Sequence, residues 1–67
     1  MKILVWKIRT EKGLTLEELS RLTGISRSTL HNIEKERNNI MPRMDALEKI
    51  AKAMNVRISD LYESKYK

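Results

Sequence analysis

Cysteine is absent from this sequence, and histidine occurs only once. Without cysteine the chain can form neither a disulfide framework nor a thiolate zinc site, and a single histidine cannot assemble the usual histidine-rich metal cluster. No apolar run approaches the roughly 20 residues that a helix needs to span a bilayer. We therefore expect no metal, no cofactor and no membrane partner.

Length and composition indicate one small, helix-rich domain. The chain has 67 residues, of which 40% are apolar and 34% charged, and a single core is typically built from about 50 to 200 residues. The net charge of +5 favours polyanionic partners such as nucleic acid. The opening apolar run, Ile3 to Trp6, is too short for a signal peptide and is followed by Lys7 and Arg9, so we expect a cytoplasmic protein.

Apolar spacing and capping residues predict a string of short helices. A first helix is expected over residues 2 to 12, ended by Gly13 in the left-handed conformation. Thr15 and Glu18 match a capping box at the start of a second helix, which Gly24 ends. Ser26 caps a third helix with one narrow apolar stripe. Apolar residues then recur at helical spacing in a fourth helix and a short fifth one: Met44, Leu47, Ile50, Ala51 and Met54, then Val56, Ile58 and Leu61.

The segment from Leu16 to Glu34 combines a two-turn helix, a glycine-containing turn and a second helix, which is a helix-turn-helix pattern. The outward positions of its second helix are Arg27, Ser28, His31, Asn32 and Lys35, with no carboxylate among them. Arginine can bind guanine O6 and N7 with two hydrogen bonds, and asparagine can do the same with adenine N6 and N7. The alternative to a DNA-binding role is that this polar face only keeps a small helix soluble.

At these positions the chain resembles the Cro and lambda-repressor type of DNA-binding domain found in bacteria and phages. The positions that carry the resemblance span roughly residues 3 to 62: Arg9, Gly13-Leu14-Thr15, Glu17-Glu18-Leu19, Gly24-Ile25-Ser26, Ser28-Thr29-Leu30, Ile33-Glu34, Pro42, Leu47, Ala51, Val56 and Leu61. The resemblance implies an all-α, compact, five-helix lambda-repressor-like domain whose second and third helices form the helix-turn-helix. It also implies one domain over 1–67 with a polar tail at 63–67, and a bacterial or phage origin.

The resemblance further implies roles for individual residues. Arg27, Ser28 and Asn32 correspond to the main base-reading positions of the family. Arg9 and Glu34 match a partly buried salt bridge between the first and third helices, the alternative being two unrelated surface charges. A lone histidine such as His31 is most often an ordinary surface side chain, and a phosphate contact fits it better than metal binding. The residues expected to grip phosphates or to flank the bases are Thr29, His31, Lys35, Arg37, Asn38 and Arg43.

Two departures from the family pattern, and a surplus of apolar residues, affect these expectations. Leu16 stands where the family commonly has a phosphate-binding glutamine, and Glu36 replaces a usual glycine. Ile3 and Trp6 lie on a face of the first helix different from its main apolar stripe. Trp6 could pack on the fifth helix, or it could form a subunit or partner-protein surface. The C-terminal region could also form such a surface. The other candidate residues are Ile40, Met41, Ile58, Tyr62 and Tyr66.

The leading functional hypothesis is sequence-specific binding of double-stranded DNA by a small transcriptional regulator, a repressor, with the third helix in the major groove. As in the family, we expect a homodimer on a palindromic operator, with the two third helices about 34 Å apart. No nucleophile with an adjacent base and no glycine-rich phosphate loop is visible, so we do not expect an enzyme. The alternative is an antitoxin or adaptor that uses the same fold mainly to bind another protein.

Overall fold

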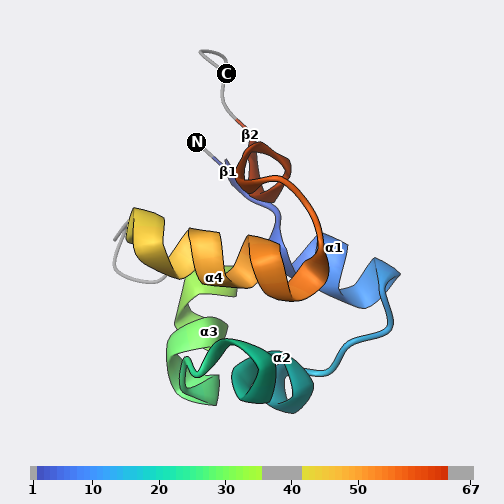
Figure 1. The fold of residues 1–67 in the computed structure, drawn as a ribbon, viewed down its shortest axis with the longest axis vertical. Coiled ribbons are helices and arrows are strands. Elements are labelled where there is room, and N and C mark those ends of the chain that lie inside the picture. The colour runs from blue at the N-terminus through green and yellow to red at the C-terminus, as the bar shows by residue number, and fades with distance from the viewer. Residues whose placement is uncertain (1, 36–41, 64–67) are drawn as a thin grey trace.

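The computed structural model describes residues 2–35 and 42–63. In these two stretches the chain forms mostly helices, and α2 and α3 lie together at the opposite end of the molecule from β1, β2 and η2 (Figure 1). The elements follow in the order β1 (Lys2–Ile3), α1 (Val5–Glu11), α2 (Leu16–Thr23), α3 (Arg27–Glu34), α4 (Met44–Met54), the 3-10 helix η2 (Ile58–Leu61) and β2 (Tyr62–Glu63). Several residues named above lie outside the described stretches: Glu36, Arg37, Asn38, Ile40, Met41 and Tyr66.

The expected fifth α-helix is a 3-10 helix, so the described residues contain four α-helices and one 3-10 turn. The segment has only four residues between Arg57 and the extended Tyr62. Such a short stretch favours hydrogen bonds over three residues, and the N–H of Asp60 donates to the carbonyl of Arg57 at 3.0 Å. The Asp60 carboxylate in turn accepts from the Arg57 N–H at 3.0 Å.

The prediction for the chain's first residues was also wrong, because α1 begins at Val5 and not at residue 2. Lys2 and Ile3 form β1, which pairs antiparallel with β2 in the register Lys2 to Glu63 and Ile3 to Tyr62. The N–H of Leu4 donates to the carbonyl of Leu61 at 2.8 Å. Glu63, expected in a polar tail, therefore belongs to a two-stranded sheet, and the fold is mostly rather than purely helical.

The ends of α1 and α2 lie where the glycines predicted them. Gly13 has a φ of 71° and Gly24 a φ of 75°. After α1 the N–H groups of Gly13 and Leu14 donate to the carbonyls of Thr10 and Arg9, which is a Schellman motif. A Cβ added at either glycine would meet nothing within 4 Å. Backbone conformation, rather than lack of space, is what favours glycine at both turns.

The buried residues of the core come from every described element except β2, whose Tyr62 packs against them partly buried. The buried members of the core are Ile3, Val5, Leu19, Leu30, Leu47, Ile50, Ala51, Met54 and Leu61. α2 packs against both α3 and α4, and α4 packs against η2. Ile3 is only 9% exposed, because β1 turns it into this core. It is therefore not a surplus surface residue, whereas Trp6 is 56% exposed.

Both predicted caps are formed at the helices of the helix-turn-helix. The Thr15 hydroxyl accepts from the Glu18 N–H at 3.1 Å, and the Glu18 carboxylate accepts from the Thr15 N–H at 3.1 Å, which completes a capping box. The Ser26 hydroxyl accepts from the Thr29 N–H at 3.2 Å at the start of α3. These local bonds define where α2 and α3 begin.

Replacing Glu18 with glutamine is expected to remove part of the pH dependence of stability. Hydrogen bonds from the backbone N–H of Thr15 and then from its side chain hold the pKa of the Glu18 carboxyl below its ordinary value. A group whose pKa is lowered by folding stabilises the fold above its unfolded pKa, and this contribution is lost as pH falls through the folded pKa. Acidification should therefore lower the free energy of unfolding more in the wild type than in Glu18→Gln.

Urea unfolding curves at neutral and acidic pH measure this difference. Glu17→Gln is the matched control, because Glu17 is the neighbouring exposed carboxylate of the same helix turn and takes no part in the capping box. An equal loss of stability on acidification in wild type and Glu18→Gln would contradict the prediction.

Candidate nucleic-acid interface

The turn between α2 and α3 is held by side-chain hydrogen bonds. The Ser20 hydroxyl donates to the carbonyl of Ile25 at 2.6 Å, and the N–H of Ile25 donates to the Thr23 hydroxyl at 3.1 Å. The N–H of Gly24 closes α2 by donating to the carbonyl of Ser20 at 2.8 Å. Because these bonds satisfy the polar groups of the turn, the angle between α2 and α3 is set by short-range chemistry.

A buried ion pair fixes α3 against α1. Arg9 Nε donates to Glu34 Oε2 at 2.7 Å and Nη2 donates to Glu34 Oε1 at 3.1 Å, which is a two-point contact. The third nitrogen, Nη1, donates to the carbonyl of Leu14 at 2.8 Å. The side chains of Arg9 and Glu34 are only 11% and 2% exposed. One guanidinium therefore joins the end of α1, the turn that follows it and the last residue of α3.

The outward face of α3 is centred on Ser28, Asn32 and Lys35, which are all exposed. Ser28 and Asn32 stand one turn apart on the same line of the helix, opposite the buried Leu30. Arg27 is also exposed but lies at the edge of this face, where it borders the start of α2. The described part of α3 thus presents an exposed polar line that ends in Lys35, with a second cation, Arg27, at its edge.

Thr29 and His31 lie on the two flanks of this face. The Thr29 hydroxyl oxygen accepts a hydrogen bond from the Ser26 hydroxyl at 2.7 Å, so its own hydrogen can still be donated to a phosphate oxygen. Thr29 is exposed and His31 is half-buried. The hydroxyl of Ser26 therefore both caps α3 and orients Thr29.

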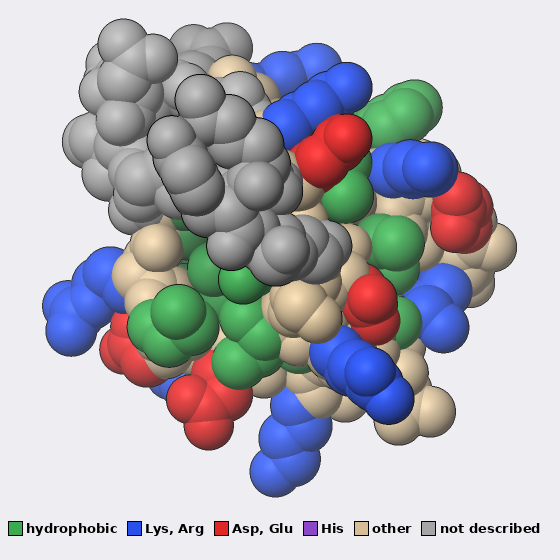
Figure 2. Space-filling view, turned by 90° about the horizontal axis from the view of Figure 1, so that it is seen from above, with side chains coloured by type: hydrophobic (Ala, Val, Ile, Leu, Met, Phe, Trp, Pro, Cys, Tyr) green, Lys and Arg blue, Asp and Glu red, His purple; other side chains and the backbone are tan. Residues whose placement is uncertain are grey.

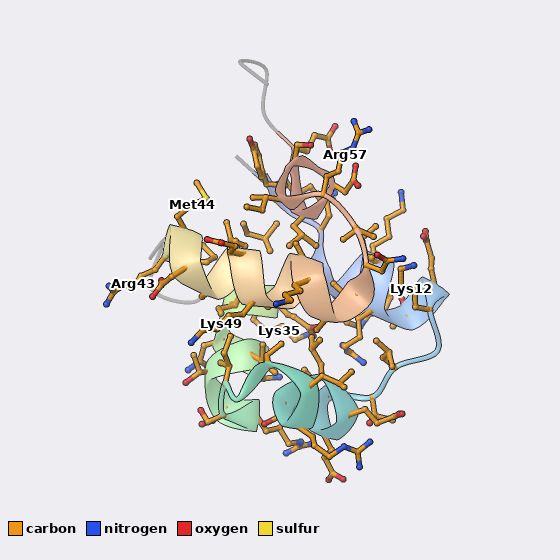
Figure 3. All side chains as sticks on the ribbon, viewed as in Figure 1. Lys12, Lys35, Arg43, Met44, Lys49 and Arg57 are labelled. Carbon is orange, nitrogen blue, oxygen red and sulfur yellow. The ribbon has the colours of Figure 1, made fainter. Side chains whose placement is uncertain are left out.

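The flanking cation Arg43 lies just before α4, and in Figure 3 it projects outward beside Met44 from the N-terminal end of that helix. Its Nε is 3.4 Å from Asp45 Oδ1, and its side chain is 86% exposed. An ion pair this exposed is weak, so Arg43 can leave Asp45 for a phosphate at little cost. Arg37 and Asn38, the other expected flanking residues, lie outside the described stretches.

The sequence did not single out Glu17 as part of the site. Glu17 lines a surface pocket of about 530 Å³ together with Thr15, Leu16 and Arg27, where the start of α2 meets the first turn of α3. The first N–H groups of an α-helix have no partner within the helix and favour anions. Glu17 places a carboxylate in the first turn of α2 and in the lining of the same pocket as Arg27. Only the contact between α2 and α3 reveals this, since ten residues separate the two side chains.

Replacing Glu17 with glutamine is expected to raise affinity for duplex DNA about two- to threefold at low salt, because it removes an exposed negative charge that faces the same region as Arg27. The gain should disappear at high salt and leave base preference unchanged. Fluorescence anisotropy with a labelled duplex measures both effects. The nearby exposed carboxylate Glu11, which does not line the pocket, provides the control Glu11→Gln; an equal gain in that variant would show that net charge alone is responsible.

The charges of the opposite end of the molecule are mixed. Figure 2, seen from the end that carries β1, β2 and η2, shows Lys and Arg side chains interspersed with Asp and Glu. Arg57 projects from this end, far from α3 (Figure 3).

In residues 2–35 and 42–63 no group of three or more His, Asp or Glu residues could hold a metal ion. No helix in the same stretches is long and apolar enough to cross a membrane.

Comparisons with known proteins agree with this geometry. Residues 5–65 match the family model of the Cro/C1-type HTH DNA-binding domain. An HTH-type transcriptional regulator from Archaeoglobus fulgidus is 36% identical over 62 residues, which cover 92% of this chain and 86% of that relative. The N-terminal DNA-binding domain of SinR from Bacillus subtilis has the same fold, with a TM-score of 0.78 and 30% identity over 94% of this chain and 90% of the SinR chain. One similar protein is thus archaeal and the other bacterial.

Proposed function

The chain belongs to the family of Cro/C1-type HTH DNA-binding domains, and we propose that it recognises a specific operator by placing α3 in the major groove of double-stranded DNA. Its family is one of transcriptional regulators and not of enzymes. The observation that carries the proposal is the exposed line of Ser28, Asn32 and Lys35 on a helix whose last residue is held by a buried ion pair. A rigid helix with an outward polar face is what base reading requires.

Within this proposal, base reading falls to the exposed residues of the first two turns of α3. Asn32 can form two hydrogen bonds with an adenine edge, and Ser28, one turn earlier, meets the neighbouring base pair. Arg27 reaches a guanine from the edge of the face. Phosphate contacts then come from the flanks of the face and from the segment between α3 and α4: Thr29, His31, Lys35, Arg37, Asn38 and Arg43.

We further propose that residues 1–67 act as one DNA-binding domain of a cytoplasmic repressor, and that two copies bind a palindromic operator. A two-fold symmetric dimer places its two α3 helices one helical turn of DNA apart, about 34 Å. Occupation of an operator by such a dimer excludes other proteins from the same DNA, which is the simplest route to repression. Half-sites of equal sequence at that spacing would support the dimer.

Selection of bound sites from a randomised duplex library, followed by titration at several salt concentrations, tests the proposal. We expect a two-fold symmetric consensus, and affinity for it at least about 10³-fold above that for random duplex. The plot of log affinity against log salt should fall with a slope of about −0.9 for each phosphate neutralised. Weak binding without sequence preference and without a salt slope would instead identify an antitoxin or adaptor that uses the fold to bind protein.

A further inference from the structure

A groove of about 600 Å³ opens between β1, the first turn of α1 and the C-terminal end of α3. It lies at the opposite end of α3 from Arg27, and of the exposed line Ser28, Asn32 and Lys35 only Lys35 is among its described lining residues. Its described lining combines apolar side chains and cations: Ile3, Leu4 and Trp6 with Lys2, Lys7 and Lys35.

The apolar residues of the groove can bind an apolar side chain of a partner. Trp6 is 56% exposed, although it is the one tryptophan of the chain. Leu4 is half-buried and Ile3 is buried, and both line the groove together with the tryptophan. Tryptophan is enriched among the residues that dominate binding energy at protein interfaces, because its large rigid ring gains much apolar contact.

The charged part of the groove is positive. Lys2, Lys7 and Lys35 are exposed, and Glu34 is the one carboxylate among the described lining residues. The Glu34 side chain is 2% exposed and receives two hydrogen bonds from Arg9, so its charge is already matched. Glu63 stands opposite Lys2 in the sheet but does not line the groove. Among the residues that the structure describes, the groove therefore presents three lysines and no carboxylate other than the already paired Glu34.

We propose that this groove binds an acidic amphipathic segment of a partner protein, with an apolar side chain on Trp6 and carboxylates beside Lys7 and Lys35. Charge complementarity selects this occupant. A second copy of the chain would bring the same lysines toward each other in a two-fold contact, which is unfavourable. Duplex DNA would satisfy the lysines but offers its phosphates, not an apolar group, to the exposed tryptophan.

The groove shares Lys35 with the outward face of α3. A partner that engages Lys35 withdraws one cation from the DNA backbone, so partner and operator are expected to weaken each other's binding. The groove proposal does not depend on the DNA-binding proposal, because the lining residues and the charge of the groove are the same whether or not α3 enters a major groove. A partner could therefore bind it even if the operator proposal failed.

Trp6 provides the signal for a direct test with the full chain. The probe is a tryptophan-free synthetic peptide, acetyl-Glu-Leu-Leu-Glu-Glu-Leu-Leu-Glu-amide, titrated while Trp6 emission is recorded. We expect a saturable shift of the emission to shorter wavelength. Replacing every glutamate of the peptide with lysine should abolish the shift, and replacing every leucine with serine should weaken it strongly, because the groove demands both charge and apolar contact.

Variants of the chain then locate the binding site. Lys7→Glu should weaken binding of the acidic peptide about fivefold. Lys52→Glu is the matched control, since Lys52 is an exposed lysine of α4 outside the groove, and it should change binding less than twofold. Far-UV circular dichroism and thermal unfolding, equal in the two variants, confirm that both are folded.

Four results would overturn the proposal. These are no saturable shift with the acidic peptide, an equal shift with the lysine peptide, or an equal loss of binding in Lys7→Glu and Lys52→Glu. The fourth is a Trp6 shift produced only by raising protein concentration or only by adding duplex DNA, which would assign the groove to a second copy or to the DNA backbone. Operator binding by the Lys7→Glu variant is measured in parallel. Because Lys7 is not among the residues proposed to contact DNA, this measurement separates failure of the groove proposal from failure of DNA recognition.

Discussion

Replacing Glu34 with leucine is expected to lower the free energy of unfolding by about 3 to 5 kcal/mol, the cost of leaving one partner of a buried ion pair without the other. The variant keeps the Arg9 guanidinium in a site where it is 11% exposed and removes both of its contacts to α3. A domain of this size has only a few kcal/mol of stability in total. The Glu34→Leu protein should therefore be largely unfolded at room temperature.

A double-mutant cycle measured by urea unfolding tests whether the effect belongs to the pair. Arg9→Met combined with Glu34→Leu should recover much of the loss, because two apolar side chains leave no buried charge behind. Arg43→Ala serves as the control for an exposed pair, since it removes the contact to Asp45 on the surface and should cost less than about 1 kcal/mol. Additive effects of Arg9→Met and Glu34→Leu would contradict a coupled pair.

Replacing Asn32 with alanine is expected to relax base preference at one position of each half-site and to weaken operator binding by about 1 to 3 kcal/mol, roughly 5- to 150-fold. Asn32 is exposed and is not among the residues of the core, so the free energy of unfolding should stay within about 0.5 kcal/mol of the wild type. Binding to the selected operator and to operators with one changed base pair measures both affinity and preference.

Lys35→Ala is the matched control for Asn32→Ala on the same face of α3. A lysine that contacts phosphate should lose affinity evenly across all sequences and reduce the salt slope by about 1, with base preference unchanged. The two variants therefore separate base reading from backbone contact. An Asn32→Ala protein that binds the selected operator as tightly as the wild type, with the same base preference, would remove Asn32 from the recognition surface.

The boundaries of α2, α3 and α4 could be predicted because their causes are local. The Thr15 and Glu18 capping box, the Ser26 cap and the positive φ of Gly24 each involve residues at most three apart in the chain. Asn55 likewise ends α4 in the left-handed conformation. Hydrogen bonds of this range leave a pattern in the sequence that can be read without knowing the fold.

The start of α1 and the end of the chain were predicted wrongly for the opposite reason. Ile3 was assigned to a helix because its spacing permitted one, but β1 pairs with β2 about sixty residues away in the sequence. The apolar spacing around Ile58 and Leu61 is equally compatible with an α-helix and a 3-10 turn. Local periodicity cannot place β1, because its deciding hydrogen bonds come from distant residues, and it cannot tell an α-helix from a 3-10 turn in so short a segment.

The sequence by itself determined the helix-turn-helix, the core positions at helical spacing and the polar residues on the outward face of α3. Only the tertiary structure decided that Ile3 is buried while Trp6 is exposed, that Glu17 and Arg27 line one pocket, and that a positive groove opens at the end of α3. The physical reason is range: caps and helical stripes depend on neighbours within one or two turns, whereas burial and grooves depend on which distant elements come to pack together.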